Sequence, residues 1–218
     1  MPKVVRARWE PARRPVRLRG TSTQGGTPSM RTPVLPFAFL LVVGSVASAL
    51  AGDDGQVFDA RLSGYHEVHF IAAPPALRGA ISTAASGKFR ARIGDDANTI
   101  SYELSYEGLE GAVTQAHIHF GQRHTVGGIV VWLCQTEGTP APAAVAALTP
   151  FCPAEGTVTG TIVPAQVLTV AGQGIDAGEF DELVAAIRAG ATYANVHSVL
   201  FPPGEIRGAI RGDRGHRD

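Results

Sequence analysis

The chain has 218 residues, 44% of them hydrophobic, and its 19 basic and 19 acidic residues give a formal net charge of zero. The charges are unevenly placed: residues 1–51 hold eight Lys or Arg against the single acid Glu10, which leaves eleven basic and eighteen acidic residues in 52–218. We therefore expect no basic patch for nucleic acid or anionic lipid in residues 52–218.

The first 51 residues are typical of a targeting segment rather than of a folded domain. An apolar run from Val34 to Val46 is followed by Ala49-Leu50-Ala51, an A-x-A cleavage site. The run is shorter than the roughly 20 residues of a membrane span, which favours a signal peptide over a retained anchor. We expect the true start at Met30, cleavage after Ala51, and export to the periplasm or cell exterior. A basic nucleic-acid-binding arm in residues 3–19 is the alternative for the part before Met30.

Residues 52–218 are long enough for one domain with a sizeable core. Alternation of apolar and polar residues predicts strands, including a hairpin of residues 87–93 and 99–107 with Lys and Arg opposite Glu on its solvent face. Ile129 to Leu133 is apolar throughout, which predicts a central strand covered on both faces. The other predicted strands are residues 56–62, 113–120, 156–163, 191–199 and 205–211.

One helix is predicted over about residues 176–189. Asp176 followed by Glu179 is the pattern of a capping box, an apolar i, i+3, i+4, i+7 stripe begins at Phe180, and Gly190 is a stop signal. We expect the stripe to pack against the sheet.

The two cysteines, Cys134 and Cys152, lie in the predicted exported part, where a disulfide between them is expected. It would close a Pro- and Ala-rich loop and contribute about 3 kcal/mol to stability. No second cysteine pair suggests a zinc site.

A motif Ala116-His117-Ile118-His119-Phe120-Gly121 places two imidazoles on one face of a strand, because side chains alternate with period two. Asn195 and His197 share a face of a later strand in the same way, so the three histidines meet if the two strands are neighbours. Three imidazoles suit zinc or copper and leave a coordination position open.

Other residues complete the candidate site. Candidates for orienting the rings are Asn195, Glu205 and Gln115, and His124 is an outlying candidate ligand. Glu205 and Arg207 share a strand face, which favours a structural ion pair over recognition of a ligand carboxylate. The sequence has no Ser-His-Asp or Cys-His arrangement for nucleophilic catalysis.

These motifs resemble the chordin-type (CHRD) domain. The resemblance runs from Phe58-Asp59-Ala60-Arg61-Leu62-Ser63-Gly64, through the His117 motif and Gly127–Val131, to residues 193–198 and 203–208. It implies an exported bacterial protein of little more than a signal peptide and this domain. It also implies an all-β, immunoglobulin-like or superoxide-dismutase-like antiparallel sandwich or barrel. Growth-factor antagonism is not implied, because the cysteine-rich modules of chordin are missing from this sequence. Full dismutase chemistry is not expected, because a fourth copper histidine and a bridging histidine cannot be assigned.

Three functional hypotheses remain open. The first is a non-catalytic binding or structural module, in which neutral, hydrogen-bonded imidazoles fix the strand register. The second is a copper- or zinc-binding protein that uses His117, His119 and His197. The third is an adhesion or matrix component that recognises an extracytoplasmic protein or polysaccharide through its loops.

Overall fold

The computed structural model describes residues 56–71 and 77–212, with only the backbone at 69–71 and 77–78. The predicted signal peptide and its cleavage site lie outside the described residues. Within these described ranges, eleven strands and one α-helix follow one another, with three short 3-10 turns at Gly64–His66, Ala146–Leu148 and Pro164–Gln166. The strands are β1 (Val57–Ser63), β2 (His69–Ile71), β3 (Leu77–Gly79), β4 (Ser86–Ile93), β5 (Ile100–Glu107), β6 (Val113–Phe120), β7 (Gly128–Cys134), β8 (Gly156–Ile162), β9 (Thr192–Ser198), β10 (Ile206–Ala209) and β11 (Arg211–Gly212).

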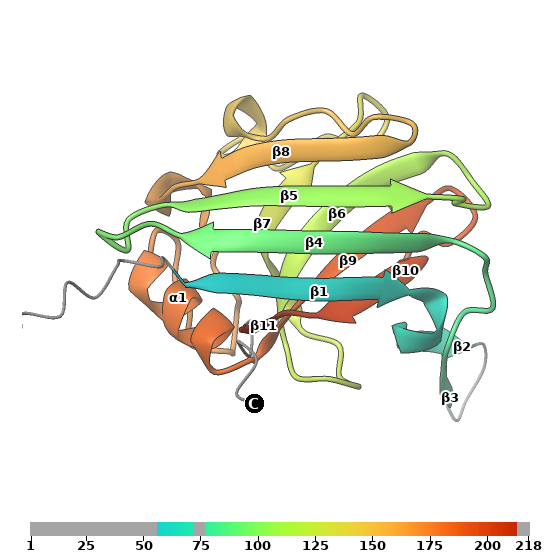
Figure 1. Cartoon of the computed structure of the whole chain (residues 1–218), viewed down its shortest axis with the longest axis horizontal. Helices are drawn as coiled ribbons and strands as arrows, with labels where there is room; N and C mark the ends of the chain where they lie inside the picture. Colours follow the sequence, from blue (N-terminus) through green and yellow to red (C-terminus); the bar gives the residue numbers. More distant parts are fainter. Residues whose placement is uncertain (1–55, 72–76, 213–218) are drawn as a thin grey trace, which may run out of the picture. The chain divides into compact units, whose positions relative to one another are not determined.

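The main sheet is antiparallel, with the strand order β7-β6-β9-β10-β1-β4-β5-β8, and β11 pairs with the start of β1. Figure 1 shows β1, β4, β5 and β8 in one layer and β10, β9, β6 and β7 in the other. The sheet bends between β1 and β10, which share a single register pair, Ser63 with Arg207. The result is a nearly closed, barrel-like all-β domain, which confirms the fold predicted from the sequence.

The core lies between the two layers and is built from the apolar faces of the strands. In β4 and β5 the buried residues alternate with exposed ones, as the period of two predicts. Leu104 and Ile100 from β5 and Ile118 from β6 are fully buried in one cluster. The predicted hairpin is confirmed, with Arg90 opposite Glu103 on its outer face.

The helix α1 (Phe180–Arg188) begins four residues later than predicted. The Asp176 N–H donates to the Glu179 carboxylate (2.8 Å), which is one half of the predicted capping box. Gly178 has a φ of +87°, so the chain turns there before the helix starts. The helix ends as predicted: Gly190 has a φ of +66° and follows the last turn. Its apolar stripe is buried in the core, as Phe180, Leu183, Val184 and Ile187 show.

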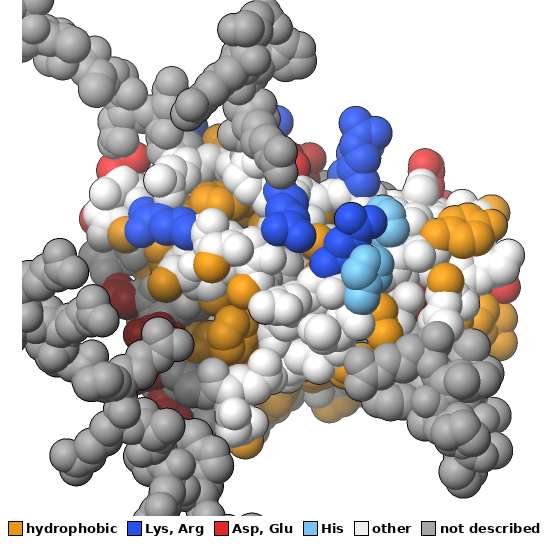
Figure 2. All heavy atoms as spheres, turned by 90° about the horizontal axis from the view of Figure 1, so that it is seen from below, with side chains coloured by type: hydrophobic (Ala, Val, Ile, Leu, Met, Phe, Trp, Pro, Cys, Tyr) orange, Lys and Arg blue, Asp and Glu red, His pale blue; other side chains and the backbone are white. Residues whose placement is uncertain are grey.

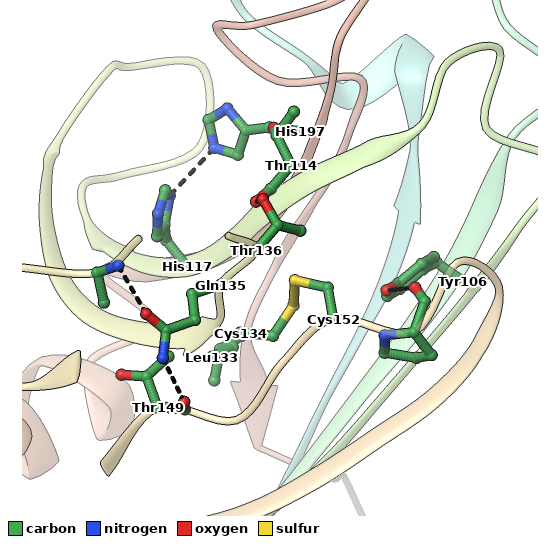
Figure 3. Close-up of a disulfide and its surroundings, with 12 residues drawn as sticks. Tyr106, Thr114, His117, Leu133, Cys134, Gln135, Thr136, Thr149, Cys152 and His197 are labelled. Atoms are coloured by element: carbon green, nitrogen blue, oxygen red, sulfur yellow. Dashed lines mark hydrogen bonds between the residues drawn. A yellow bond between two sulfur atoms is a disulfide. The ribbon is translucent and has the colours of Figure 1, made fainter. Parts of the chain in front are cut away.

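The disulfide between Cys134 and Cys152 is confirmed, with the two Cα atoms 5.0 Å apart (Figure 3). Gln135, next to Cys134, organises the loop that the disulfide closes. Its amide donates to the carbonyl oxygens of Ala146 and Thr149, and its own carbonyl accepts the N–H of Ala141. Among the described residues, no helix is long and apolar enough to cross a membrane.

Candidate functional site

The three histidines lie on neighbouring antiparallel strands, β6 and β9, on the face turned away from the core. Register pairs His117 with Asn195 and Gln115 with His197, while Ala116, Ile118 and Val196 on the other face are buried in the core. All seven residues of β9 are buried, so loops and neighbouring side chains cover its outer face too. The prediction that the histidines meet in the folded sheet is confirmed.

The three rings form a compact cluster. Nδ1 of His117 is 3.1 Å from Nε2 of His197, as the dashed line in Figure 3 shows. The His119 ring centre is 5.5 Å from that of His117 and 6.3 Å from that of His197. One ring nitrogen from each residue lies within 4.8 Å of those of the other two.

Backbone carbonyls fix the orientation of two rings. The carbonyl oxygen of Gly127 is 2.9 Å from Nδ1 of His119, and that of Pro202 is 2.7 Å from Nδ1 of His197. Because a carbonyl oxygen only accepts hydrogen bonds, each Nδ1 carries the proton, and Nε2 of the neutral ring carries a lone pair. The Nε2 of His197 then accepts from Nδ1 of His117, which leaves a lone pair on Nε2 of His117 as well.

Two of these lone pairs are buried and unused. Nε2 of His117 and Nε2 of His119 have no hydrogen-bond partner within the described part of the chain. Burial lowers the pKa of His119 to about 4 against the opposing effect of the hydrogen bond to Gly127, and the positive charge of Arg207 acts in the same direction as burial. Burial, together with the two neighbouring imidazoles, also lowers the pKa of His117. Both rings are therefore neutral near pH 7, the state in which an imidazole binds a metal ion.

Aromatic side chains surround the cluster. Trp132 of β7 packs edge-on against His117 with ring centres 4.3 Å apart, and Tyr193 of β9 stacks on His119 at 4.7 Å. The guanidinium carbon of Arg207 lies 3.4 Å from the centre of the Tyr193 ring. Strand β9 runs between β6 and β10, so Tyr193 separates His119 from Arg207.

The spacing of the ring nitrogens can be compared with that of a metal site. Zinc binds imidazole nitrogen at about 2.0–2.1 Å, so two ligand nitrogens of one ion are at most about 4.2 Å apart. The 3.1 Å contact between His117 and His197 joins Nδ1 of one ring to Nε2 of the other, so it is a hydrogen bond and not the separation of two Nε2 ligand atoms. The widest separation, at most 4.8 Å, requires ring movements of some tenths of an ångström. Three Nε2 atoms are of the donor type that Zn²⁺ and Cu²⁺ bind, but ligation by all three would require His197 Nε2 to give up its hydrogen bond from His117 Nδ1.

The residues predicted to orient the rings have other partners. The Asn195 amide donates to the Glu67 carboxylate (2.6 Å) and to the carbonyl of Ile206 (3.4 Å). Gln115 is half-buried opposite His197, and no hydrogen bond joins it to the three rings within the described residues. His124 lies in an exposed turn with a φ of +68°, outside the cluster.

Glu205 and Arg207, the predicted ion pair, also contact different groups among the described residues. The Glu205 carboxylate is fully buried and accepts from the Thr83 hydroxyl (2.9 Å) and from the backbone N–H of Glu110 (2.8 Å). Arg207 donates to the carbonyl oxygen of Gln122 (3.0 Å) and stacks on Tyr193. Glu205 thus links its own segment to those that carry Thr83 and Glu110. Arg207 instead packs on Tyr193, beside the histidine cluster.

Glu67 and Tyr193 also lie at the site, although neither was predicted from the sequence to belong to it. Burial raises the pKa of the Glu67 carboxyl to about 7, against the opposing effects of the Val68 N–H, Arg207 and Asn195. Its position in a short turn after β1 gave no periodic signal. Tyr193 could have been found, because it lies two residues before Asn195 on the same face of the strand.

By its fold and its candidate site, the protein is an all-β domain that carries a buried cluster of three histidines on the outer face of its sheet. Residues 58–210 match the family model of the CHRD domain, which is more than half of the chain, so the chain belongs to this family. The match begins in β1 and ends just after β10, and it includes the cluster, the disulfide and α1. No curated protein and no solved structure matches the chain.

Proposed function

We propose that the chain is an exported, non-catalytic binding module whose ligand is one Cu²⁺ or Zn²⁺ ion held by His117, His119 and His197. The observation that carries this proposal is the pair of buried Nε2 atoms, on His117 and His119, that have no partner in the described residues. An unpaired buried acceptor costs about 1–3 kcal/mol, and a metal ion would use both.

The competing interpretation is that the imidazoles only fix the strand register. That role works best when every buried polar atom has a partner, because a partly satisfied network destabilises the fold. Here the Nδ1 protons all have acceptors, whereas two of the three Nε2 lone pairs are unused. A metal ion would use these two lone pairs together with that of His197 Nε2, which would give up its hydrogen bond from His117.

Copper(II) should bind more tightly than zinc. Affinity for divalent metals at a nitrogen site rises from Zn²⁺ to Cu²⁺. Three protein ligands leave a coordination position open. The small remaining exposure of His119 (8%) and His197 (5%) places the cluster near the surface, which suits uptake of an ion from solution.

The test is metal binding by protein produced without a His-tag. We expect one equivalent of Cu²⁺ or Zn²⁺ by elemental analysis and by calorimetric titration of EDTA-treated protein. Metal at 100 times its dissociation constant should stabilise the fold by about 2.7 kcal/mol. The His119→Ala variant should lose binding, whereas His124→Asn, which changes an exposed histidine in a turn, should keep it.

Two results would refute the metal site. One is wild-type protein that binds no more metal than His119→Ala. The other is equal loss of binding in His124→Asn, which would point to adventitious surface histidines. If His119→Ala melts far lower than wild type and neither binds metal, the cluster is structural. Export has its own test, since the mass of the secreted protein should correspond to a chain that begins at Gly52.

A further inference from the structure

A second feature of the structure is a cavity of about 240 Å³ lined mainly by arginine side chains. Its lining residues are Arg61 of β1, His66, Arg123, Arg207 and Ala209 of β10, and Arg211 of β11. On the face of the molecule seen in Figure 2, Lys or Arg side chains stand beside histidine side chains. The topology brings these groups together, because β10 and β11 both pair with β1.

This concentration of charge contrasts with the rest of the domain. Residues 52–218 hold eleven Lys or Arg against eighteen acids, and four of the eleven line this one cavity. The net charge of residues 52–218 does not reveal this cluster, since net charge does not describe how charges are distributed over a surface. The nearby acids, Asp59 on β1 and Glu67, do not line the cavity.

Arg207 is the fixed element of the cavity. Its side chain is buried (3% exposed), lies flat on the Tyr193 ring and donates one N–H to the carbonyl oxygen of Gln122. A guanidinium has five N–H donors, so this single bond leaves further donors to a ligand, although Glu67 also interacts electrostatically with Arg207. Burial lowers the pKa of Arg207, yet an arginine stays protonated in proteins.

We infer that this cavity binds a tetrahedral oxyanion, a phosphate or sulfate group. Guanidinium groups pair with such oxygens through two parallel N–H···O bonds, and several of them converge here. The volume lies below the 300–1,000 Å³ of pockets for drug-sized ligands, which suits one small charged group. The inference is independent of the proposed metal site, because none of the three clustered histidines lines the cavity.

The test is titration of EDTA-treated wild-type protein with inorganic phosphate and with sulfate at constant ionic strength. We expect saturable binding with a dissociation constant of about 1 mM or tighter. Arg123→Gln and Arg61→Gln, both on exposed side chains, should each weaken binding about tenfold, as expected for loss of a charge-assisted hydrogen bond. Arg90→Gln removes the same charge from an exposed position outside the cavity and should leave the affinity unchanged.

A second experiment identifies the source of the oxyanion. Sedimentation with phosphatidylcholine vesicles, with and without phosphatidylglycerol, compares a lipid phosphate with the free ion. Binding to the free ion alone supports a soluble ligand, and phosphate-competed binding to the anionic vesicles supports a lipid headgroup. Absence of saturable binding to phosphate, sulfate and vesicles would overturn the inference. So would an equal effect of Arg90→Gln, because it would show a non-specific response to net charge.

Discussion

The β4–β5 hairpin and the β6–β9 pair belong to the same sheet but use their outer faces differently. In β4 and β5 the outer residues are mostly exposed and charged, and only the inner face is buried. In β9 every residue is buried, and its outer face carries Tyr193, Asn195 and His197. Both pairs contribute apolar side chains to one core, but only the second builds another buried layer, and that layer is polar.

This difference indicates that the inner faces of the sheet serve mainly stability, whereas the outer face of β6–β9 has additional requirements. The inner face of each pair excludes water from apolar side chains, which stabilises the fold without directional requirements. The outer face of β6–β9 instead requires specific hydrogen bonds, because a buried polar atom without a partner is costly. Unused acceptors in that layer are therefore the basis of the proposed metal site, whereas the exposed charges of the hairpin are not.

The largest expected effect is on the core beneath the hairpin. Leu104 is fully buried at the centre of β5. Leu104→Ala should lower the free energy of unfolding by about 3–4 kcal/mol, through lost burial and the cavity left behind. Urea denaturation measures the loss, and metal content should not change. A fall in metal content in this variant would show that the two layers are coupled.

Loss of the disulfide should cost nearly as much. Cys134 and Cys152 are 18 positions apart, so the Cys134→Ser/Cys152→Ser double variant should lose about 3 kcal/mol, mainly because the unfolded chain gains freedom. Thermal unfolding with and without reductant checks the value, since reduced wild-type protein should match the double variant. A double variant as stable as oxidised wild type would contradict the prediction.

Glu67 allows a pH test of the polar layer. Its pKa is raised from 4.5 to about 7, so the folded chain binds a proton that the unfolded chain has released, and wild-type stability falls as pH rises between these values. Glu67→Gln removes that contribution while keeping an acceptor for the Val68 N–H. Relative to wild type, the variant should gain about 2 kcal/mol between pH 4.5 and 7. A constant difference across this range would show that Glu67 is not protonated in the folded state.

The sequence predicted the hairpin half of the sheet well, because its outer face is exposed and the alternation is therefore visible. Arg90 and Glu103 alternate with Phe89, Ala91 and Leu104, and each faces the side that the period of two assigns. The helix start was misplaced, because the Asp176–Glu179 contact occurs in a turn as well as in a helix. The Gly178 conformation that separates the two cases cannot be read from residue type alone.

The site was predicted only in its central part. His117, His119 and His197 follow from the period of two and from the pairing of β6 with β9. Their hydrogen-bond partners, the carbonyls of Gly127 and Pro202, are backbone atoms in loops, and no residue type marks them. The basic cavity was missed for a similar reason, since Arg61, Arg123 and Arg207 are far apart in the sequence and meet only through the sheet order.

A smaller effect on stability is expected when one imidazole of the polar layer is replaced by an apolar ring. His117→Phe keeps an aromatic contact with Trp132 and removes the unpartnered Nε2, but it takes the hydrogen bond from Nε2 of His197. These effects oppose each other, so metal-free stability should change by no more than about 1 kcal/mol. Metal binding should be lost. A destabilisation of about 3 kcal/mol or more in EDTA would instead support a structural role for the cluster.

The smallest effect is expected on the exposed face of the hairpin. Arg90 is directly opposite Glu103 on β5 and is exposed to solvent, where ion pairs are weak because water and salt screen them. Arg90→Gln should therefore lower the free energy of unfolding by less than about 0.5 kcal/mol, and 1 M NaCl should abolish the difference. Parallel urea denaturation of the two proteins at low and high salt measures it. A loss above 1 kcal/mol would show that this outer face, like that of β9, contains a specific buried interaction.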